Sequence, residues 1–132
     1  MNTWGSVNIR SYQDAERYYR QYPKRHWPEV ELYHNTYLHR DVDGDAYHII
    51  YHATTVVSYY KNGVIHVDNG HYQTATTKAR INDHIPMRFS VWQKDWKWYI
   101  TIRPSADDPN WNETTIPYHN GFVDSWLVVL VW

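Results

Sequence analysis

Residues 54–82 read TTVVSYYKNGVIHVDNGHYQTATTKARIN, and two turn signals divide this stretch into a predicted hairpin and a predicted helix. The runs 54–60 and 64–67 consist mainly of β-branched and aromatic residues, which are typical of strands, and Asn62-Gly63 stands between them. An Asn-Gly pair favours a type I′ turn, because that turn needs a positive φ at both of its central residues. The stretch therefore predicts an antiparallel hairpin, and the other elements are expected to be arranged around it.

The register of this hairpin decides which side chains face the core. With the Asn-Gly pair as a two-residue loop, Tyr60 faces Ile65 and Ser58 faces Val67. We expect the more apolar face to be the core face; it carries Val56, Ser58, Tyr60, Ile65 and Val67.

After a second turn cluster, Asp-Asn-Gly, the apolar spacing changes from two to about four, and small, hydroxylated and basic residues replace the aromatic ones. This change predicts a short helix. Thr76 or Thr77 is expected to cap it, Ile81 and Ile85 to form its buried pair, and Pro86 to end it.

The remaining chain predicts one more helix and further antiparallel pairs. The expected elements are a helix over 11–22, a strand over 30–33, hairpins over 35–51 and 88–102, and a closing strand over 122–132. The fold class that follows is α+β, mainly an antiparallel meander sheet curled into a partly open barrel or strongly bent sheet, with two short helices. We expect a single domain over 1–132, with residues 1–9 loosely ordered and 103–115 forming a long polar loop.

Composition excludes several classes of function. The chain has 132 residues, 13 basic and 14 acidic, and its formal charge of −1 gives no global attraction to nucleic acid or to an anionic membrane. Without cysteine it has no disulfide, thiolate nucleophile or cysteine-based zinc site. The longest apolar run, residues 126–132, is far shorter than the ~20 residues that cross a bilayer. We therefore expect no membrane partner, and we expect a cytoplasmic location.

Aromatic residues are unusually abundant, with 8 Trp and 13 Tyr against 2 Phe. Trp and Tyr supply packing area together with a polar atom, which suits either a wet interface or a small core rich in tyrosine hydrogen bonds. Under the interface interpretation a protein partner is expected first, and a homodimer is compatible with the same surface. The expected aromatic surface comprises Tyr19, Trp27, Tyr59, Tyr72 and Trp96.

The start of the predicted helix brings hydroxyls, two cations and an amide to a place where free backbone N–H groups favour an anion. This segment is the candidate binding site for a phosphate, from a nucleotide or a nucleic acid, or for a partner. Its residues are Thr74, Thr76, Thr77, Lys78, Arg80 and Asn82. The competing interpretation is that one threonine caps the helix and both cations are merely solvated.

Catalytic and metal signals are weak. His48 and His52 lie four apart, which in a strand places them about 13 Å from each other, too far for one ion, so neither a metal nor a cofactor is expected. His52 with Asp68, or His71 with Asp83, is a conceivable acid/base pair, but the sequence does not set the distance within either pair. We assign no catalytic residue and expect binding rather than catalysis.

Several motifs together resemble a known group of proteins. They are Asn35-Thr36-Tyr37-Leu38, Tyr51-His52-Ala53-Thr54 followed by Val56-Val57, Asn62-Gly63, and Tyr72 and Thr74 followed by Thr76-Thr77-Lys78-Ala79-Arg80-Ile81-Asn82. Over residues 35–101 this pattern resembles a family of small proteins encoded by tailed bacteriophages and prophages. The resemblance implies a phage context, and so the bacterial host cytoplasm, and it supplies no catalytic residue.

Two functions of different classes follow, with a third as a remaining alternative. The first is a non-enzymatic binding protein of phage type that engages a host or viral macromolecule through an aromatic-rich surface, including as an inhibitor of a host factor. The second is a nucleic-acid or nucleotide binder that uses Lys78 and Arg80 with a Tyr/Trp stacking platform. The third is a small hydrolase or nuclease-like enzyme, which would require titratable side chains that converge in one pocket.

Overall fold

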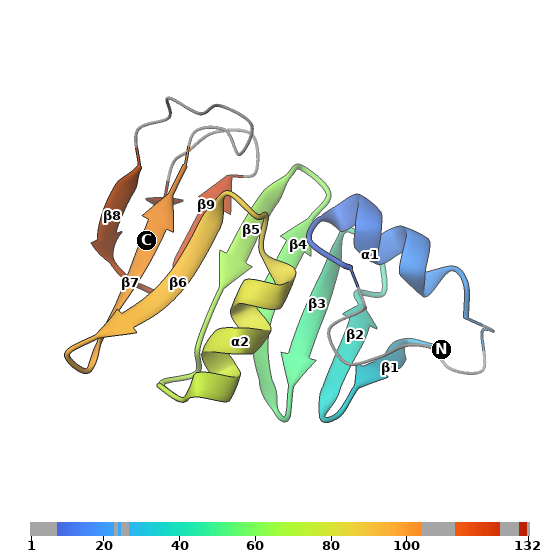
Figure 1. Ribbon diagram of the computed structural model, residues 1–132. Helices are drawn as coiled ribbons and strands as arrows, with labels where there is room; N and C mark the ends of the chain where they lie inside the picture. Colours follow the sequence, from blue (N-terminus) through green and yellow to red (C-terminus); the bar gives the residue numbers. More distant parts are fainter. Residues whose placement is uncertain (1–7, 23, 25–26, 104–112, 125–129, 132) are drawn as a thin grey trace.

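The strands of the chain form two antiparallel sheets that carry helices on one face. The computed structural model describes residues 8–22, 24, 27–103, 113–124 and 130–131. The predicted loose segment 1–9 and the predicted loop 103–115 lie largely outside these residues. Within them the fold is α+β with antiparallel strands and two helices, as predicted, and the sheets do not close into a barrel (Figure 1).

The larger sheet has seven strands in the order β1-β2-β3-β4-β5-β9-β10, and the smaller has the order β6-β7-β8. The strands of the larger sheet are β1 (Glu29–Tyr33), β2 (Thr36–Arg40), β3 (Ala46–Tyr51), β4 (Thr54–Tyr60), β5 (Val64–Val67), β9 (Gly121–Asp124) and β10 (Leu130–Val131). Those of the smaller sheet are β6 (Phe89–Lys94), β7 (Lys97–Ile102) and β8 (Thr114–Pro117). The first five strands form a meander, and the chain returns as β9 to pair with β5.

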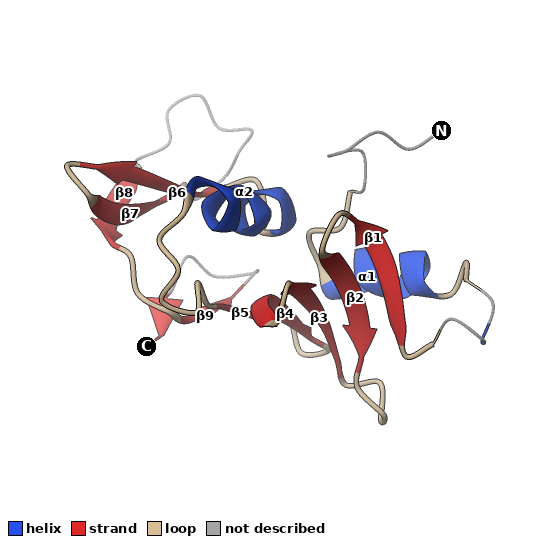
Figure 2. Ribbon diagram, turned by 90° about the horizontal axis from the view of Figure 1, so that it is seen from below, coloured by secondary structure: helices blue, strands red, loops and turns tan. Residues whose placement is uncertain are grey.

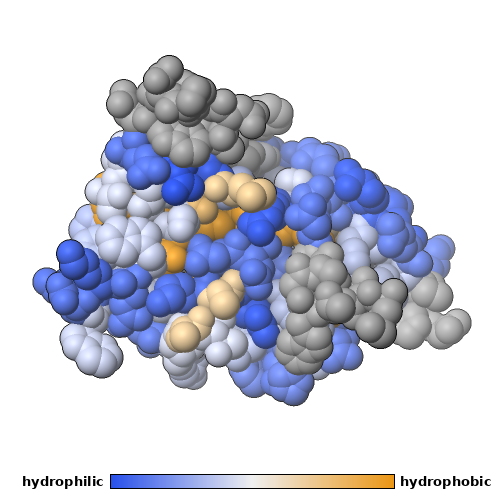
Figure 3. Space-filling view, in the orientation of Figure 1, coloured by the Kyte–Doolittle hydropathy of each residue, from blue (hydrophilic) through white to orange (hydrophobic). Residues whose placement is uncertain are grey.

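Helices α1 (Tyr12–Tyr19) and α2 (Ala75–His84) pack on the same face of the larger sheet, and α2 also contacts the smaller sheet (Figure 2). Ser11 caps α1, because its side chain accepts a hydrogen bond from Asp14 N. For α2 the cap is Thr74 rather than Thr76 or Thr77. Seen from the helix side, most of the surface is hydrophilic and strongly hydrophobic residues show only in a narrow central area (Figure 3).

The register predicted for the central hairpin is wrong by one residue. Tyr59, not Tyr60, pairs with Ile65, and Ser58 pairs with His66. Of the predicted turn pair only Gly63 takes a positive φ, +95°, so the loop is longer than a two-residue type I′ turn, and the Gly63 N–H donates to the Tyr60 carbonyl.

This slip exchanges the faces of β4. Val57 and Tyr59 join Ile65 and Val67 in the core beneath the helices, and Ser58 moves to the opposite face of the sheet. The two-residue turn with both φ values positive occurs instead between β6 and β7, at Asp95 and Trp96. The alternating apolar side chains of that hairpin are buried; they are Phe89, Val91, Trp98, Ile100 and Ile102.

A buried polar cluster fixes the end of α2 over the central strand. The Tyr59 hydroxyl lies between the carbonyl oxygens of Ile9 and His84, and both oxygens accept its single proton in a shared hydrogen bond. His84 Nδ1 donates to the Ile9 carbonyl at 2.9 Å, so its Nε2 accepts from the Tyr33 hydroxyl at 2.5 Å. Burial lowers the pKa of His84 to about 4 and raises the pKa of Tyr33 to about 12, which keeps both groups neutral.

The last turn of α2 is tied to the smaller sheet by the amide side chain of Asn82. Asn82 donates from Nδ2 to the Val91 carbonyl and accepts the Val91 N–H at Oδ1, both at 2.8 Å. Arg10 donates to the carbonyls of Asn82 and Ile85 at 2.7 Å, and so satisfies orphan acceptors at the end of the helix. These bonds join the two sheets through α2.

We expect Asn82→Ala to lower the free energy of unfolding by about 2 kcal/mol, because two hydrogen bonds are lost and the Val91 backbone groups are left without partners. Urea unfolding followed by tryptophan fluorescence measures the change. Gln73→Ala removes an exposed amide side chain just before the same helix and should change stability by less than about 0.5 kcal/mol. Equal effects of the two substitutions would refute the role given to Asn82.

The pH dependence of stability should contain a contribution from His84. Its folded pKa, about 4, is below the usual unfolded value of about 6.5, so the unfolded chain takes up the proton first and stability is lost as pH falls through that window. The loss approaches about 3 kcal/mol. His84→Gln should flatten this part of the profile, whereas His71→Gln, at an exposed histidine, should retain it. Denaturant titrations between pH 7 and pH 4 test both variants.

Candidate functional site

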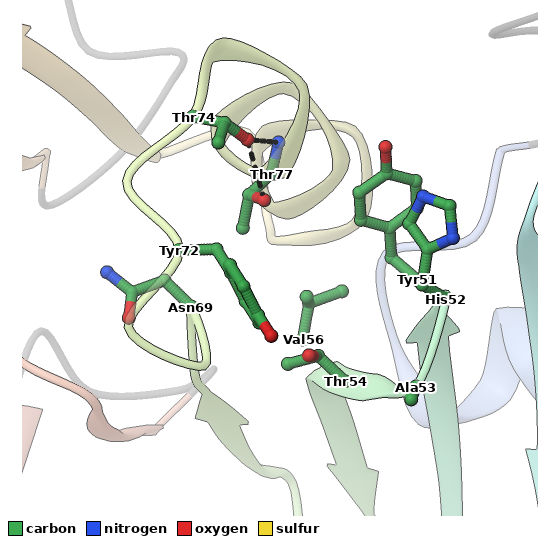
Figure 4. Close-up of a pocket in the computed structure, with 9 residues that line it drawn as sticks. All are labelled: Tyr51, His52, Ala53, Thr54, Val56, Asn69, Tyr72, Thr74 and Thr77. Atoms are coloured by element: carbon green, nitrogen blue, oxygen red, sulfur yellow. Dashed lines mark hydrogen bonds between the residues drawn. The ribbon is translucent and has the colours of Figure 1, made fainter.

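A pocket of about 350 Å³ opens at the start of α2. It lies between the first turn of that helix, the turn that joins β3 to β4, and the connection from β5 to α2 (Figure 4). The residues that line it are Tyr51, His52, Ala53, Thr54, Val56, Asn69, Tyr72, Thr74 and Thr77. We call this cavity the α2 pocket. Its volume is at the lower end of the range for ligand sites, so it suits one aromatic or aliphatic group.

The helix side of the pocket is built by the cap of α2. Thr74 Oγ1 accepts from Thr77 N at 3.1 Å and lies 2.9 Å from the Thr77 hydroxyl. These bonds satisfy one of the free N–H groups of the first turn and hold both side chains at the cavity (Figure 4).

The connection from β5 forms a second side. Asn69 is buried, its Oδ1 accepts from His71 N at 2.9 Å, and its carbonyl accepts from Tyr72 N at 2.9 Å. These bonds close a tight turn with Gly70 at φ +60°. The turn presents Tyr72 across the cavity from Tyr51 and His52 (Figure 4), and Tyr72 remains 62% exposed.

The β3–β4 turn forms the third side of the pocket, and the Arg80 guanidinium packs behind its Tyr51 ring. The ring centroids of Tyr51 and His52 are 4.4 Å apart, and the Arg80 guanidinium lies 5.4 Å from the Tyr51 centroid and 4.7 Å from that of Tyr33. Arg80 Nε also donates to Thr36 Oγ1 at 3.1 Å. His52 has a φ of +55°, an uncommon conformation for a non-glycine residue and one that is found preferentially at functional sites.

The structure separates the six predicted binding residues into two groups. Thr74 and Thr77 line the pocket, and Thr76 is exposed on the first turn beside them. Three other side chains turn away into intramolecular contacts. Lys78 donates to Gln93 at 3.3 Å, the Arg80 side chain is only 13% exposed among two tyrosines, and Asn82 binds the β6 backbone.

Two of the five residues predicted to form the aromatic surface, Tyr19 and Tyr59, are not at the surface. Tyr19 and Tyr59 are buried in the core, because the first packs against Tyr47 and the second donates its hydroxyl under α2. Trp27 is partly buried and stacks on Tyr19 with ring centroids 4.6 Å apart. Tyr72 is exposed at the pocket, and Trp96 is 88% exposed in the turn between β6 and β7.

Sequence reasoning missed the wall of the pocket that the β3–β4 turn contributes. Tyr51, His52 and Thr54 are separated from the helix start by about 20 residues, and only tertiary packing brings them there. The resemblance pattern did include all three, which was the available signal. Within the described residues, no three His, Asp or Glu side chains gather closely enough to hold a metal ion.

One family model, described as Kyanoviridae Gp96 protein, matches residues 24–125. This range contains both helix α2 and every residue that lines the α2 pocket. Searches among curated proteins and among solved structures find no match. In the part of the chain that the structure describes, neither helix has the length and apolar character needed to cross a bilayer.

Gly70→Ala tests the packing of the pocket floor. A Cβ at this position would lie 2.7 Å from Thr54 Cγ2 and 2.9 Å from Thr54 Oγ1, so either the Thr54 side chain or the β5–α2 connection would have to shift. Gly63→Ala is the matched control, because it carries a similar penalty for positive φ in a different turn. We expect the Gly70 variant alone to change the near-ultraviolet circular dichroism of the tyrosines and to lose at least about 1 kcal/mol more stability than the control.

Proposed function

Since the chain belongs to the Kyanoviridae Gp96 protein family, and is therefore a phage-encoded protein, we propose that it is a binding protein which engages a host or viral macromolecule. The site of engagement is the α2 pocket with Tyr72 at its rim. In this proposal the protein acts in the host cytoplasm by occupying its partner, which inhibits that partner where it is a host factor.

The single observation that carries the proposal is an exposed tyrosine beside a cavity. Tyr72 is 62% exposed, although most of the other described aromatic residues are buried or half-buried. An aromatic ring that keeps this exposure next to a pocket of about 350 Å³ has the character of an interface anchor. The pocket accepts a reciprocal anchor, an apolar or aromatic side chain of a protein partner.

A protein partner fits this lining better than a phosphate does. Among the residues that the structure describes, no lysine or arginine lines the α2 pocket. The two cations that motivated phosphate binding instead contact Gln93, Thr36 and the rings of Tyr33 and Tyr51. A nucleic-acid site needs cations that are available to neutralise phosphates, so the contacts of Lys78 and Arg80 support an internal role for both.

The experiment is capture from host lysate with four versions of the protein. Ala53→Phe places a ring at the mouth of the pocket from an exposed position, and Tyr72→Ala removes the ring at its rim. Trp96→Ala is the control, since it removes an exposed aromatic outside the pocket. We expect one protein to be retained by the wild type and the control and to be lost with both pocket variants.

With that protein purified, Tyr72→Ala should weaken the dissociation constant at least about 10-fold, as expected for a central aromatic anchor. Calorimetry at two salt concentrations separates the alternatives. If a single-stranded oligonucleotide binds the wild type with an affinity that falls steeply with salt, and does not bind Lys78→Ala plus Arg80→Ala, nucleic acid is the ligand and the proposal is overturned. A partner retained equally by all four versions would also overturn it.

A further inference from the structure

A row of polar side chains crosses the face of the larger sheet opposite the helices. His39 pairs with His48, His48 with Ser58, and Ser58 with His66, so the row follows the register through β2, β3, β4 and β5. Cross-strand partners project from the same face, and this face is not the one on which Tyr47 and Tyr59 pack under the helices. A groove of about 500 Å³ runs over the row.

The centre of the row has the geometry of an activated hydroxyl. His48 Nδ1 lies 2.7 Å from Ser58 Oγ, and His48 Nε2 lies 2.9 Å from Asp41 Oδ1. An ionised carboxylate only accepts hydrogen bonds, so Nε2 carries the imidazole proton and donates it to Asp41. The lone pair of Nδ1 is thereby directed at Ser58, whose hydroxyl donates to it.

We propose that Ser58 is a nucleophile for acyl transfer, with His48 as its general base and Asp41 as a positioning residue. The arrangement meets the geometric requirement for nucleophilic catalysis: nucleophile and base are within hydrogen-bond reach, and a third group orients the base. This activity is separate from partner binding, because the groove and the α2 pocket share no residue.

The reaction uses an ester and water. Ser58 Oγ attacks the carbonyl carbon while its proton moves to His48 Nδ1; the ester C–O bond then breaks and the leaving alcohol takes that proton. In the second half, water gives a proton to His48 Nδ1 and its oxygen attacks the acyl carbon. The bond to Ser58 Oγ breaks and the hydroxyl is restored, so the net products are one carboxylic acid and one alcohol.

Two further imidazoles flank the reacting centre. His66 is the register partner of Ser58, and His39 is the register partner of His48. His39 Nδ1 is buried without a hydrogen-bond partner, at 3.5 Å from Glu29 Oε2. Along the row, His66 therefore stands next to Ser58, and His39 stands one strand beyond His48.

The surroundings narrow the substrate class. Glu29 and Asp68 line the same groove, and their carboxylates disfavour anionic substrates such as phosphodiesters. Ser58 is only 3% exposed at the floor of the groove, so only an acyl group of small cross-section can reach its hydroxyl. The substrate class is therefore a neutral or cationic ester with a small acyl chain.

The test uses 4-nitrophenyl acetate with the full-length protein. Release of nitrophenolate is followed by absorbance, and the acetylated residue is identified by mass spectrometry of peptides after an acid quench. We expect acetyl on Ser58 of the wild-type protein. Exposed histidines also hydrolyse this ester, but they leave no acetyl-serine, so the location of the adduct and not turnover alone decides the outcome.

Three variants and a control complete the design. His48→Gln should slow acetylation of Ser58 about 100-fold or more, and Ser58→Ala should abolish the adduct. Asp41→Asn should slow acetylation of Ser58, because His48 Nε2 then loses the carboxylate that orients its ring. Ser90→Ala changes a half-buried serine of β6 outside the groove and should leave the rate unchanged.

Thermal unfolding by circular dichroism establishes that each variant is folded. If a variant does not fold, the adduct map of the wild-type protein still decides. Absence of acetyl-Ser58 from the wild type overturns the proposal, and so does acetylation of Ser58 no faster than that of Ser90. An acetylation rate that is unchanged in folded His48→Gln would show that the row is only a structural hydrogen-bond ladder.

Discussion

The hydroxyl of Tyr59 holds the architecture together, because it is the point at which the central strand, the end of α2 and the N-terminal segment meet. It lies between the Ile9 and His84 carbonyls in a fully buried position, where an unpaired polar group would be costly. His84 uses both ring nitrogens there, one toward Ile9 and one toward Tyr33. With its end held in this way, α2 places its first turn beside the β3–β4 turn, and residues of both line the α2 pocket.

The two faces of strand β4 carry separate features. Val57 and Tyr59 face the helices and belong to the core, whereas Ser58 faces the groove on the other side of the sheet. Alternation along a strand makes this division unavoidable once the register is set. A shift of the β4–β5 register by one residue would exchange the two sets, so the turn at Gly63 decides that Ser58 shares its face with His66, whereas the β3–β4 register places Ser58 beside His48.

The candidate site was predictable in its location but not in the roles of its residues. Hydroxyl-bearing residues at a helix start have a local function in capping, so the sequence could place a threonine cap in this segment, although it favoured Thr76 or Thr77 and the cap is Thr74. Lys78, Arg80 and Asn82 have long or branched polar side chains whose partners come from other elements. Arg80 illustrates the difference, because it binds Thr36 and stacks on Tyr33 and Tyr51, which are distant in sequence. Such partners are chosen by packing, and the sequence offers no signal for them.

By itself the sequence determined the α+β class, the hairpins and the two helices, because period-two and period-four patterns, turn residues and caps act within a few neighbouring positions. Tertiary structure alone decided the register of the central hairpin, the burial of Tyr19 and Tyr59, and the convergence of Asp41, His48 and Ser58. The physical reason is that these outcomes depend on contacts between distant segments. Loop geometry and core packing set the energies of those contacts, and neither is encoded in a local pattern.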